Sequence, residues 1–190
     1  MKVMLIDEDR GRAALLKQAL LDSGYQISAV IHTNEDLLKK TFEIECDVIL
    51  IDMESPNRDT LEYLTSLKKE QAKPVVILAE NDDRQLIESA VKAGVSAYVV
   101  DGFSQKRLKA ILEVAIARFR EYNAMCKELE STKHKLAERK SIEKAKGILM
   151  KHKGFDEETA YQTLRRMAMD KHLKMIDVAE QIINVAELLA

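Results

Sequence analysis

Acidic residues follow two apolar runs of the chain, and their spacing could hold a divalent metal ion. Asp7 and Glu8 follow the run 3–6, and Asp52 follows the run 48–51. In a doubly wound parallel sheet the carboxyl ends of the strands meet at the point where ligands bind. Carboxylate oxygens suit Mg²⁺, and a metal there could position Asp52 as the acceptor of a phosphoryl group. The simple alternative is that these acids only end strands in loops.

The elements that would position these acids alternate along the first half of the chain. Five short runs rich in Val and Ile predict strands, and apolar stripes at helical spacing lie between them, the third helix ending at Gly94. The predicted strands are 3–6, 27–31, 48–51, 75–78 and 97–100. Repeated β-α units predict an α/β fold with a parallel sheet and right-handed crossovers.

From residue 104 onward the sequence shows only helical patterns. Apolar residues recur every seven positions, which predicts a long helix over 104–140 that pairs with a second copy as a coiled coil. These dimerisation positions are Leu108, Ala115, Tyr122, Leu129 and Leu136. The alternative is a single helix whose first half packs on the α/β domain and whose second half packs on the C-terminal domain.

The end of this helix is strongly basic. Residues 131–153 carry a net charge of +6, although the whole chain carries −2. A basic segment on an acidic protein suggests a polyanionic partner, and a solvated helix face is the other explanation. Beyond Gly154, an acidic cap at Asp156 and two more apolar stripes predict two further helices, which need the long helix to complete one small core.

The first 120 residues resemble the receiver domain of response regulators. The resemblance rests on the segments 5–8, 49–52 with Pro56, and 97–100. It implies a flavodoxin-like fold with a five-stranded parallel sheet over 1–120. It also implies that Asp52 is the phosphoacceptor and that Asp7 and Glu8 hold the metal.

Two positions depart from the receiver pattern. Receivers carry a hydroxyl residue at the end of the fourth strand and a lysine after the fifth, where this chain has Ala79 and Asp101. A carboxylate at the second position would repel a phosphorylated aspartate. We therefore expect a pseudo-receiver that docks another protein, with Asp52 vestigial as a phosphoacceptor.

Residues 131–190 resemble the ANTAR domain of AmiR/NasR-type transcription antiterminators, and the chain is most similar to the nitrate-responsive, NasT-type members. The matching segments are 136–140, 142–150, 160–161, 164–168 and 177–179. The resemblance implies a small three-helix RNA-binding domain that binds paired hairpins in leader RNA and prevents termination at nitrate or nitrite assimilation genes. It further implies a homodimer and, as input, either a cytosolic NasS-like sensor protein or a histidine kinase. The expected RNA-binding residues are Lys140, Lys144, Lys146, Lys151, Arg165 and Arg166.

Other classes of function are less favoured by the sequence. The four histidines are scattered and form no catalytic arrangement with Cys or Ser, so we do not expect an enzyme. A DNA-binding response regulator and a phosphorelay or adaptor protein remain alternatives, because three helices can hide a helix-turn-helix and receivers catalyse their own phosphorylation. Two isolated cysteines and the lack of an apolar run of roughly 20 residues favour a cytoplasmic protein that does not cross a membrane.

Overall fold

The computed structural model describes residues 1–32, 37–70, 72–100 and 105–188. The chain divides into two compact units, 1–123 and 124–190. Each unit has its own hydrophobic core.

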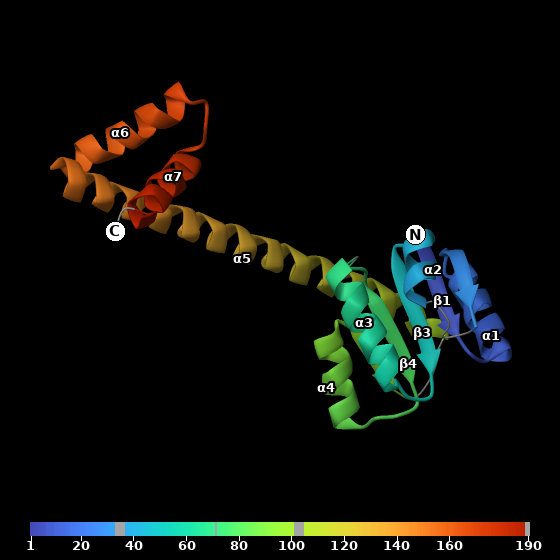
Figure 1. Cartoon of the computed structure of the whole chain (residues 1–190). Coiled ribbons are helices and arrows are strands. Elements are labelled where there is room, and N and C mark those ends of the chain that lie inside the picture. The colour runs from blue at the N-terminus through green and yellow to red at the C-terminus, as the bar shows by residue number, and fades with distance from the viewer. Residues whose placement is uncertain (33–36, 71, 101–104, 189–190) are drawn as a thin grey trace. The chain divides into compact units, whose positions relative to one another are not determined.

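The first unit is a five-stranded parallel sheet in the order β2-β1-β3-β4-β5, with helices between the strands (Figure 1). Its strands are β1 (Lys2–Asp7), β2 (Gln26–Ile31), β3 (Val48–Met53), β4 (Val75–Ala79) and β5 (Ala97–Val100). Its helices are α1 (Arg10–Asp22), α2 (Leu37–Glu43), α3 (Arg58–Glu70), α4 (Arg84–Ala93) and the first part of α5 (Gln105–Lys153). This confirms the predicted α/β fold and all five strands.

Both faces of this sheet are buried. Successive side chains of β1, β3 and β4 point to opposite faces, so the inner residues of these strands are apolar, as in other sheets covered on both sides. Helices α2, α3 and α4 cover one face, while α1 and the first part of α5 cover the other. The polar ends of the strands are thereby left as the open edge of the sheet.

Local sequence signals set the ends of the helices around this edge. The Asp9 carboxylate accepts a hydrogen bond from the Arg12 amide at 2.8 Å, and this cap starts α1. Helix α4 ends at Gly94 as predicted, in the left-handed conformation with φ of 111°. The positive φ favours glycine there, and a Cβ at Gly94, 2.8 Å from Lys68 Cδ, would also displace the Lys68 side chain.

The second unit is built from three helices. The end of α5 packs with α6 (Glu157–Asp170) and α7 (Met175–Leu188) around Ala145, Leu164 and Val178. The predicted cap is confirmed, because the Asp156 carboxylate accepts a hydrogen bond from the Thr159 amide at 2.8 Å. The three-helix architecture expected for the C-terminal domain is thus present.

The two cysteines differ in environment. Cys46 is buried in the first unit, and burial raises the pKa of its thiol. Cys126 is exposed on α5. Of the helices that the structure describes, none has both the length and the apolar character needed to span a bilayer.

Candidate functional site

The carboxyl ends of β1 and β3 bring two of the expected acidic residues together. Asp7 and Asp52 are paired in register across the two strands. The Asp7 side chain is fully buried and that of Asp52 is 13 % exposed. Burial raises the pKa of both carboxyl groups, that of Asp52 to about 6, and the neighbouring charge of Asp7 contributes to the rise at Asp52. Two carboxylates held this close need a nearby cation if both are to stay ionised.

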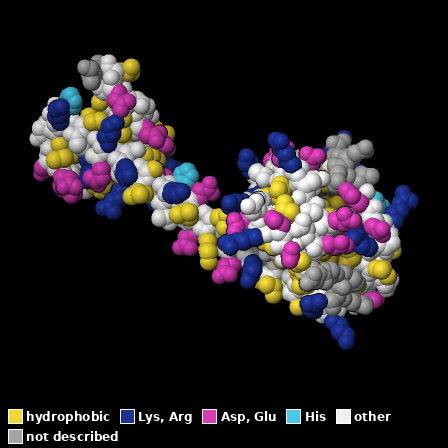
Figure 2. Space-filling view, turned by 90° about the horizontal axis from the view of Figure 1, so that it is seen from below, with side chains coloured by type: hydrophobic (Ala, Val, Ile, Leu, Met, Phe, Trp, Pro, Cys, Tyr) yellow, Lys and Arg dark blue, Asp and Glu magenta, His cyan; other side chains and the backbone are white. Residues whose placement is uncertain are grey.

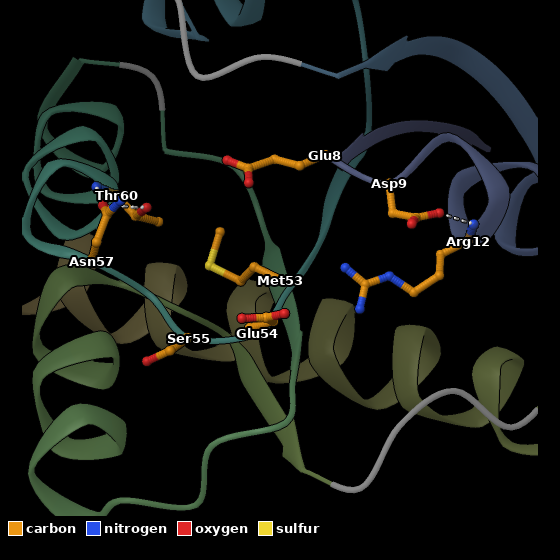
Figure 3. Close-up of a pocket in the computed structure, with 8 residues that line it drawn as sticks. All are labelled: Glu8, Asp9, Arg12, Met53, Glu54, Ser55, Asn57 and Thr60. Carbon is orange, nitrogen blue, oxygen red and sulfur yellow. Dashed lines mark hydrogen bonds between the residues drawn. The ribbon is translucent and has the colours of Figure 1, made fainter.

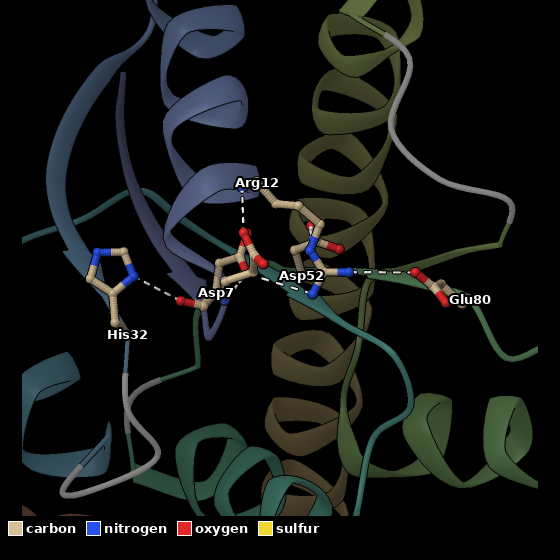
Figure 4. A network of polar contacts seen from close by, with 6 residues as sticks. Asp7, Arg12, His32, Asp52 and Glu80 are labelled. Carbon is tan, nitrogen blue, oxygen red and sulfur yellow. Dashed lines mark hydrogen bonds and ion pairs between the residues drawn. The ribbon is translucent and has the colours of Figure 1, made fainter.

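Arg12 supplies a cation at this place. Its guanidinium reaches from the first turn of α1 to lie between the strand ends and the loop after β4 (Figure 4). Nη2 lies 3.8 Å from Asp7 Oδ1, Nε lies 3.7 Å from Asp52 Oδ2, and Nη1 lies 3.4 Å from Glu80 Oε1. On the far side of Asp7, His32 Nδ1 lies 2.9 Å from the backbone oxygen of that residue.

Glu8 does not join the pair of aspartates. Its carboxylate points away from Arg12, towards the Asn57 and Thr60 side of an adjacent cavity (Figure 3). The cavity has a volume of about 430 Å³, and Arg12 enters it from the opposite side. The three expected metal ligands are therefore split between two places.

The residues at this edge do not fit a divalent metal as they stand. Within the described part of the chain, Asp7 Oδ2 is buried and has no hydrogen-bond partner, as a metal-binding oxygen would be. However, among the described residues no three His, Cys, Asp or Glu side chains converge to hold a metal ion. The positive charge beside Asp7 and Asp52 is a guanidinium instead.

Of the two positions that depart from the receiver pattern, the structure describes one. Ala79 is buried as the last residue of β4. It offers no hydroxyl group to a phosphoryl group on Asp52. Asp101 lies outside the described residues.

In the second unit, three of the expected RNA-binding lysines share one stripe of α5. Lys140, Lys144 and Lys151 are exposed, and with Gly147 they lie within about 60° of one another around the helix axis. We call these three residues the lysine stripe. It lies opposite the side on which Ala145 packs into the core. The predicted basic face is thus open to a ligand.

Lys146 is placed differently. Its side chain is only 8 % exposed, and its Nζ lies 2.8 Å from Glu157 and 2.9 Å from Glu143. The hydrogen bond to Glu157 raises the pKa of Lys146 and lowers that of Glu157, so both groups stay charged at neutral pH. In this arrangement Lys146 links α5 to α6 through its ion pair with Glu157. Its ammonium group is therefore not free to contact a phosphate.

The two arginines lie on another helix. Arg165 and Arg166 are exposed on α6. On the face drawn in Figure 2, Lys and Arg side chains are interspersed with Asp and Glu over both units and do not form one broad basic field. A polyanion would therefore have to be held by a local set of cations.

The five predicted dimerisation positions differ in how exposed their side chains are. Leu108 and Ala115 are buried in the core of the first unit, so they are not available to a second copy, and this part of the prediction is corrected. Tyr122 lies under Lys68 Nζ, 5.8 Å from the ring centroid. Leu129 and Leu136 are 56 % and 54 % exposed. The first turns of the helix thus pack on the sheet, as the single-helix interpretation predicts, and pairing of the exposed apolar row with a second copy stays a prediction.

Arg12 and Glu80 are the site residues that the sequence analysis missed. A signal for Arg12 was present, because Asp9 caps α1 and places Arg12 in the first turn, where a side chain can reach back over the strand ends. Glu80 directly follows the observed β4, two residues beyond the predicted end of that strand, and so shares the edge with Asp7 and Asp52.

Comparison with known families covers both units. Residues 3–113 match the response regulator receiver domain, and residues 130–183 match the ANTAR domain. The chain is 31 % identical over 182 residues to the transcriptional regulatory protein PdtaR of Mycobacterium tuberculosis, covering 95 % of this chain and 89 % of that protein. It is 39 % identical over 88 residues to the nitrate regulatory protein of Klebsiella oxytoca, covering 46 % of this chain and 22 % of that protein.

A solved structure shows the same fold in the first unit. The response regulator TrrA of Thermotoga maritima, in complex with Mg²⁺ and BeF, superposes with a TM-score of 0.51 at 24 % identity, over 60 % of this chain and 97 % of the other. Together, the two domain matches and the near full-length relative establish the family of the protein. The chain belongs to the response regulators in which a receiver domain is followed by an ANTAR domain.

Proposed function

We propose that this protein is a transcription antiterminator that binds paired hairpins in leader RNA and so prevents termination, at genes for nitrate or nitrite assimilation. The observation that carries the proposal is the lysine stripe, which is exposed, opposite the core, and part of the matched ANTAR domain. The similarity to a nitrate regulatory protein supports the choice of target genes. Such a protein acts by binding and not as an enzyme.

Gly147 adds a second argument for a ligand on this stripe. It lies inside α5, where glycine costs about 1 kcal/mol relative to alanine. No atom of the described residues lies within 4 Å of a Cβ built on it, so their packing does not require glycine there. However, because glycine has no side chain, the helix backbone is exposed at this position within the lysine stripe. We infer that the sugar-phosphate backbone of the RNA approaches the helix closely at this point.

The ion pairs of the lysines suit this role. Lys144 Nζ lies 2.7 Å from Glu187 Oε1 of α7, but both side chains are more than half exposed. An exposed pair of this kind is worth about 0–1 kcal/mol, so RNA can displace the carboxylate. Lys146, by contrast, keeps α6 in place so that Arg165 and Arg166 are held beside the rest of the domain. Arg side chains on α6 can stack on unpaired loop bases and read them.

Competition between RNA and DNA tests the proposed function. The full chain is titrated with a labelled leader RNA that carries two hairpins, and unlabelled duplex DNA or RNA is then added. We expect the RNA to compete and the duplex DNA to compete only weakly, because single-stranded loops expose their base edges and a duplex does not. Preferential binding of duplex DNA would support the alternative, a DNA-binding response regulator. Salt dependence alone does not separate the two, since both ligands are polyanions.

Replacing Gly147 by alanine should separate stability from RNA binding. The variant should unfold a few degrees higher, because about 1 kcal/mol of helix propensity is gained. Its RNA affinity should fall about tenfold, because the added methyl group keeps the backbone of the RNA away. Thermal unfolding and fluorescence titration measure the two effects.

The control for Gly147→Ala is Thr132→Ala, a change to alanine at another exposed position of α5. It should leave RNA affinity as it is. RNA binding by Gly147→Ala at wild-type strength would show that no close approach occurs there.

The input to the regulator is proposed to be a partner protein, either a ligand-binding sensor or a histidine kinase that docks on the receiver unit. The missing hydroxyl at Ala79 and the guanidinium of Arg12 beside Asp52 argue on chemical grounds against a strong phosphorylation switch. A sensor that sequesters the regulator until its ligand arrives is the simplest route that remains.

Phosphorylation is expected to change RNA binding very little. The chain is incubated with Mg²⁺ and acetyl phosphate, modification of Asp52 is measured by mass spectrometry, and RNA affinity is measured before and after. The physical reason is that Ala79 cannot donate the hydrogen bond that would report a phosphoryl group to the rest of the domain. Stoichiometric modification with a gain of about tenfold in affinity, equal to about 1.4 kcal/mol, contradicts this expectation.

A further inference from the structure

Arg12 is held in place at the carboxyl ends of the receiver strands. Its backbone is fixed by the Asp9 cap, with 2.8 Å between the Arg12 amide nitrogen and Asp9 Oδ1. Its three guanidinium nitrogens each face a different carboxylate, at 3.4–3.8 Å from Asp7, Asp52 and Glu80 (Figure 4). The Arg12 side chain thus forms ion pairs with carboxylates of β1, β3 and the segment after β4 at the same time.

The two aspartates need a cation more than surface acids do. Asp7 is fully buried, and the side chain of Asp52 is 13 % exposed. Removing ionised carboxylates from water is costly unless an opposite charge lies nearby, and two like charges on paired strands add to that cost. One oxygen, Asp7 Oδ2, has no hydrogen-bond partner among the residues that the structure describes. The negative electrostatic potential at Asp7 and Asp52 therefore favours binding of a cation between them.

We propose that the Arg12 guanidinium is a built-in counter-ion that takes the place of a divalent cation between Asp7 and Asp52. The receiver then holds both carboxylates without metal, and Mg²⁺ enters only when Arg12 swings out. A Mg²⁺ ion needs oxygens at about 2.0–2.1 Å in octahedral order, and a guanidinium already facing the same oxygens would repel it. Because Glu8 points into the adjacent cavity, it does not complete a set of three ligands.

The test compares metal binding by the full-length wild type, Arg12→Ala and Arg10→Ala. Arg10 is the matched control, since it starts the same helix and is exposed. Each protein is titrated with Mg²⁺ and with Mn²⁺ by calorimetry, and thermal unfolding is followed with and without metal. Without metal, we expect Arg12→Ala to have a lower melting temperature than wild type. Metal should raise the melting temperature of this variant. We also expect it to bind metal at least about tenfold more tightly than wild type or Arg10→Ala.

Two results would overturn the proposal. The first is wild-type protein that binds Mg²⁺ as tightly as Arg12→Ala and gains as much thermal stability from it. The second is Arg12→Ala that gains no metal affinity. If Arg12→Ala fails to fold without metal, Arg12→Lys and Arg12→Gln decide the matter: the first keeps the charge and should still exclude Mg²⁺, while the second loses it and should admit Mg²⁺. Equal metal affinity in these two variants counts against a role for the charge of Arg12.

Discussion

Replacement of all three residues of the lysine stripe by alanine is expected to weaken RNA binding about a hundredfold. Each lysine that meets a phosphate contributes about 1 kcal/mol net, and each 1.4 kcal/mol is a factor of ten in affinity. If the loops behave as single strands, each lost contact also lowers the salt dependence by about 0.7, so the slope should fall by about 2. The melting temperature should hardly change, because Lys140, Lys144 and Lys151 are all exposed.

A matched variant shows whether position matters beyond charge. Lys106, Lys109 and Lys127 are also exposed on α5 but lie outside the stripe, so their triple replacement by alanine removes the same charge. It should lower RNA affinity far less. Equal losses in the two triple variants would mean that net charge, and not a defined face, attracts the RNA. Unchanged affinity in a folded Lys140, Lys144 and Lys151 variant would remove the stripe as the binding face.

The second large effect is expected in the oligomeric state. Leu129→Lys combined with Leu136→Lys should convert a dimer to a monomer, because charges would enter the exposed apolar row of α5. Binding to a two-hairpin RNA should then fall towards the affinity for one hairpin, since two linked sites no longer act together. Analytical ultracentrifugation and titration with one-hairpin and two-hairpin RNAs measure the two results.

Val114 provides the control for this experiment. It is an exposed apolar residue of the same helix, in the part that packs on the receiver sheet. Val114→Lys should leave association unchanged. Wild-type protein that sediments as a monomer at working concentration would contradict the dimer, and the lysine-stripe prediction would still stand for single hairpins.

The fold followed from the sequence where the pattern has one physical cause. Runs such as 48–51 are apolar at every position because both sheet faces are covered, so the strands could be located from the sequence. The ends of parallel strands share an edge, so the proximity of Asp7 and Asp52 was predictable too. Helix α2 was not singled out, since seven residues are too few to show a helical period clearly.

The details of the sites depended on contacts that spacing does not encode. Leu108 and Leu129 occupy the same heptad position, yet one packs on the sheet and the other is exposed. An apolar residue looks the same in a sequence whether its partner is its own sheet or another chain. Likewise, Lys146 and Lys144 are both lysines of one basic run. Only the packing of α6 against α5 shows that Lys146 is bound by Glu143 and Glu157.

Because one of the two cysteines is buried and the other is exposed, the protein has one thiol that a labelling reagent can reach. Cys46 is buried with a raised pKa, so its thiolate is scarce and poorly accessible. Cys126 is exposed and lies between Tyr122 and Leu129, in the stretch of α5 with the exposed apolar row. A maleimide dye or spin label should therefore modify the native chain at this single position without any engineered cysteine. In a parallel pair of helices the two labels would lie close together, which makes residue 126 a ready distance reporter for chain association and orientation.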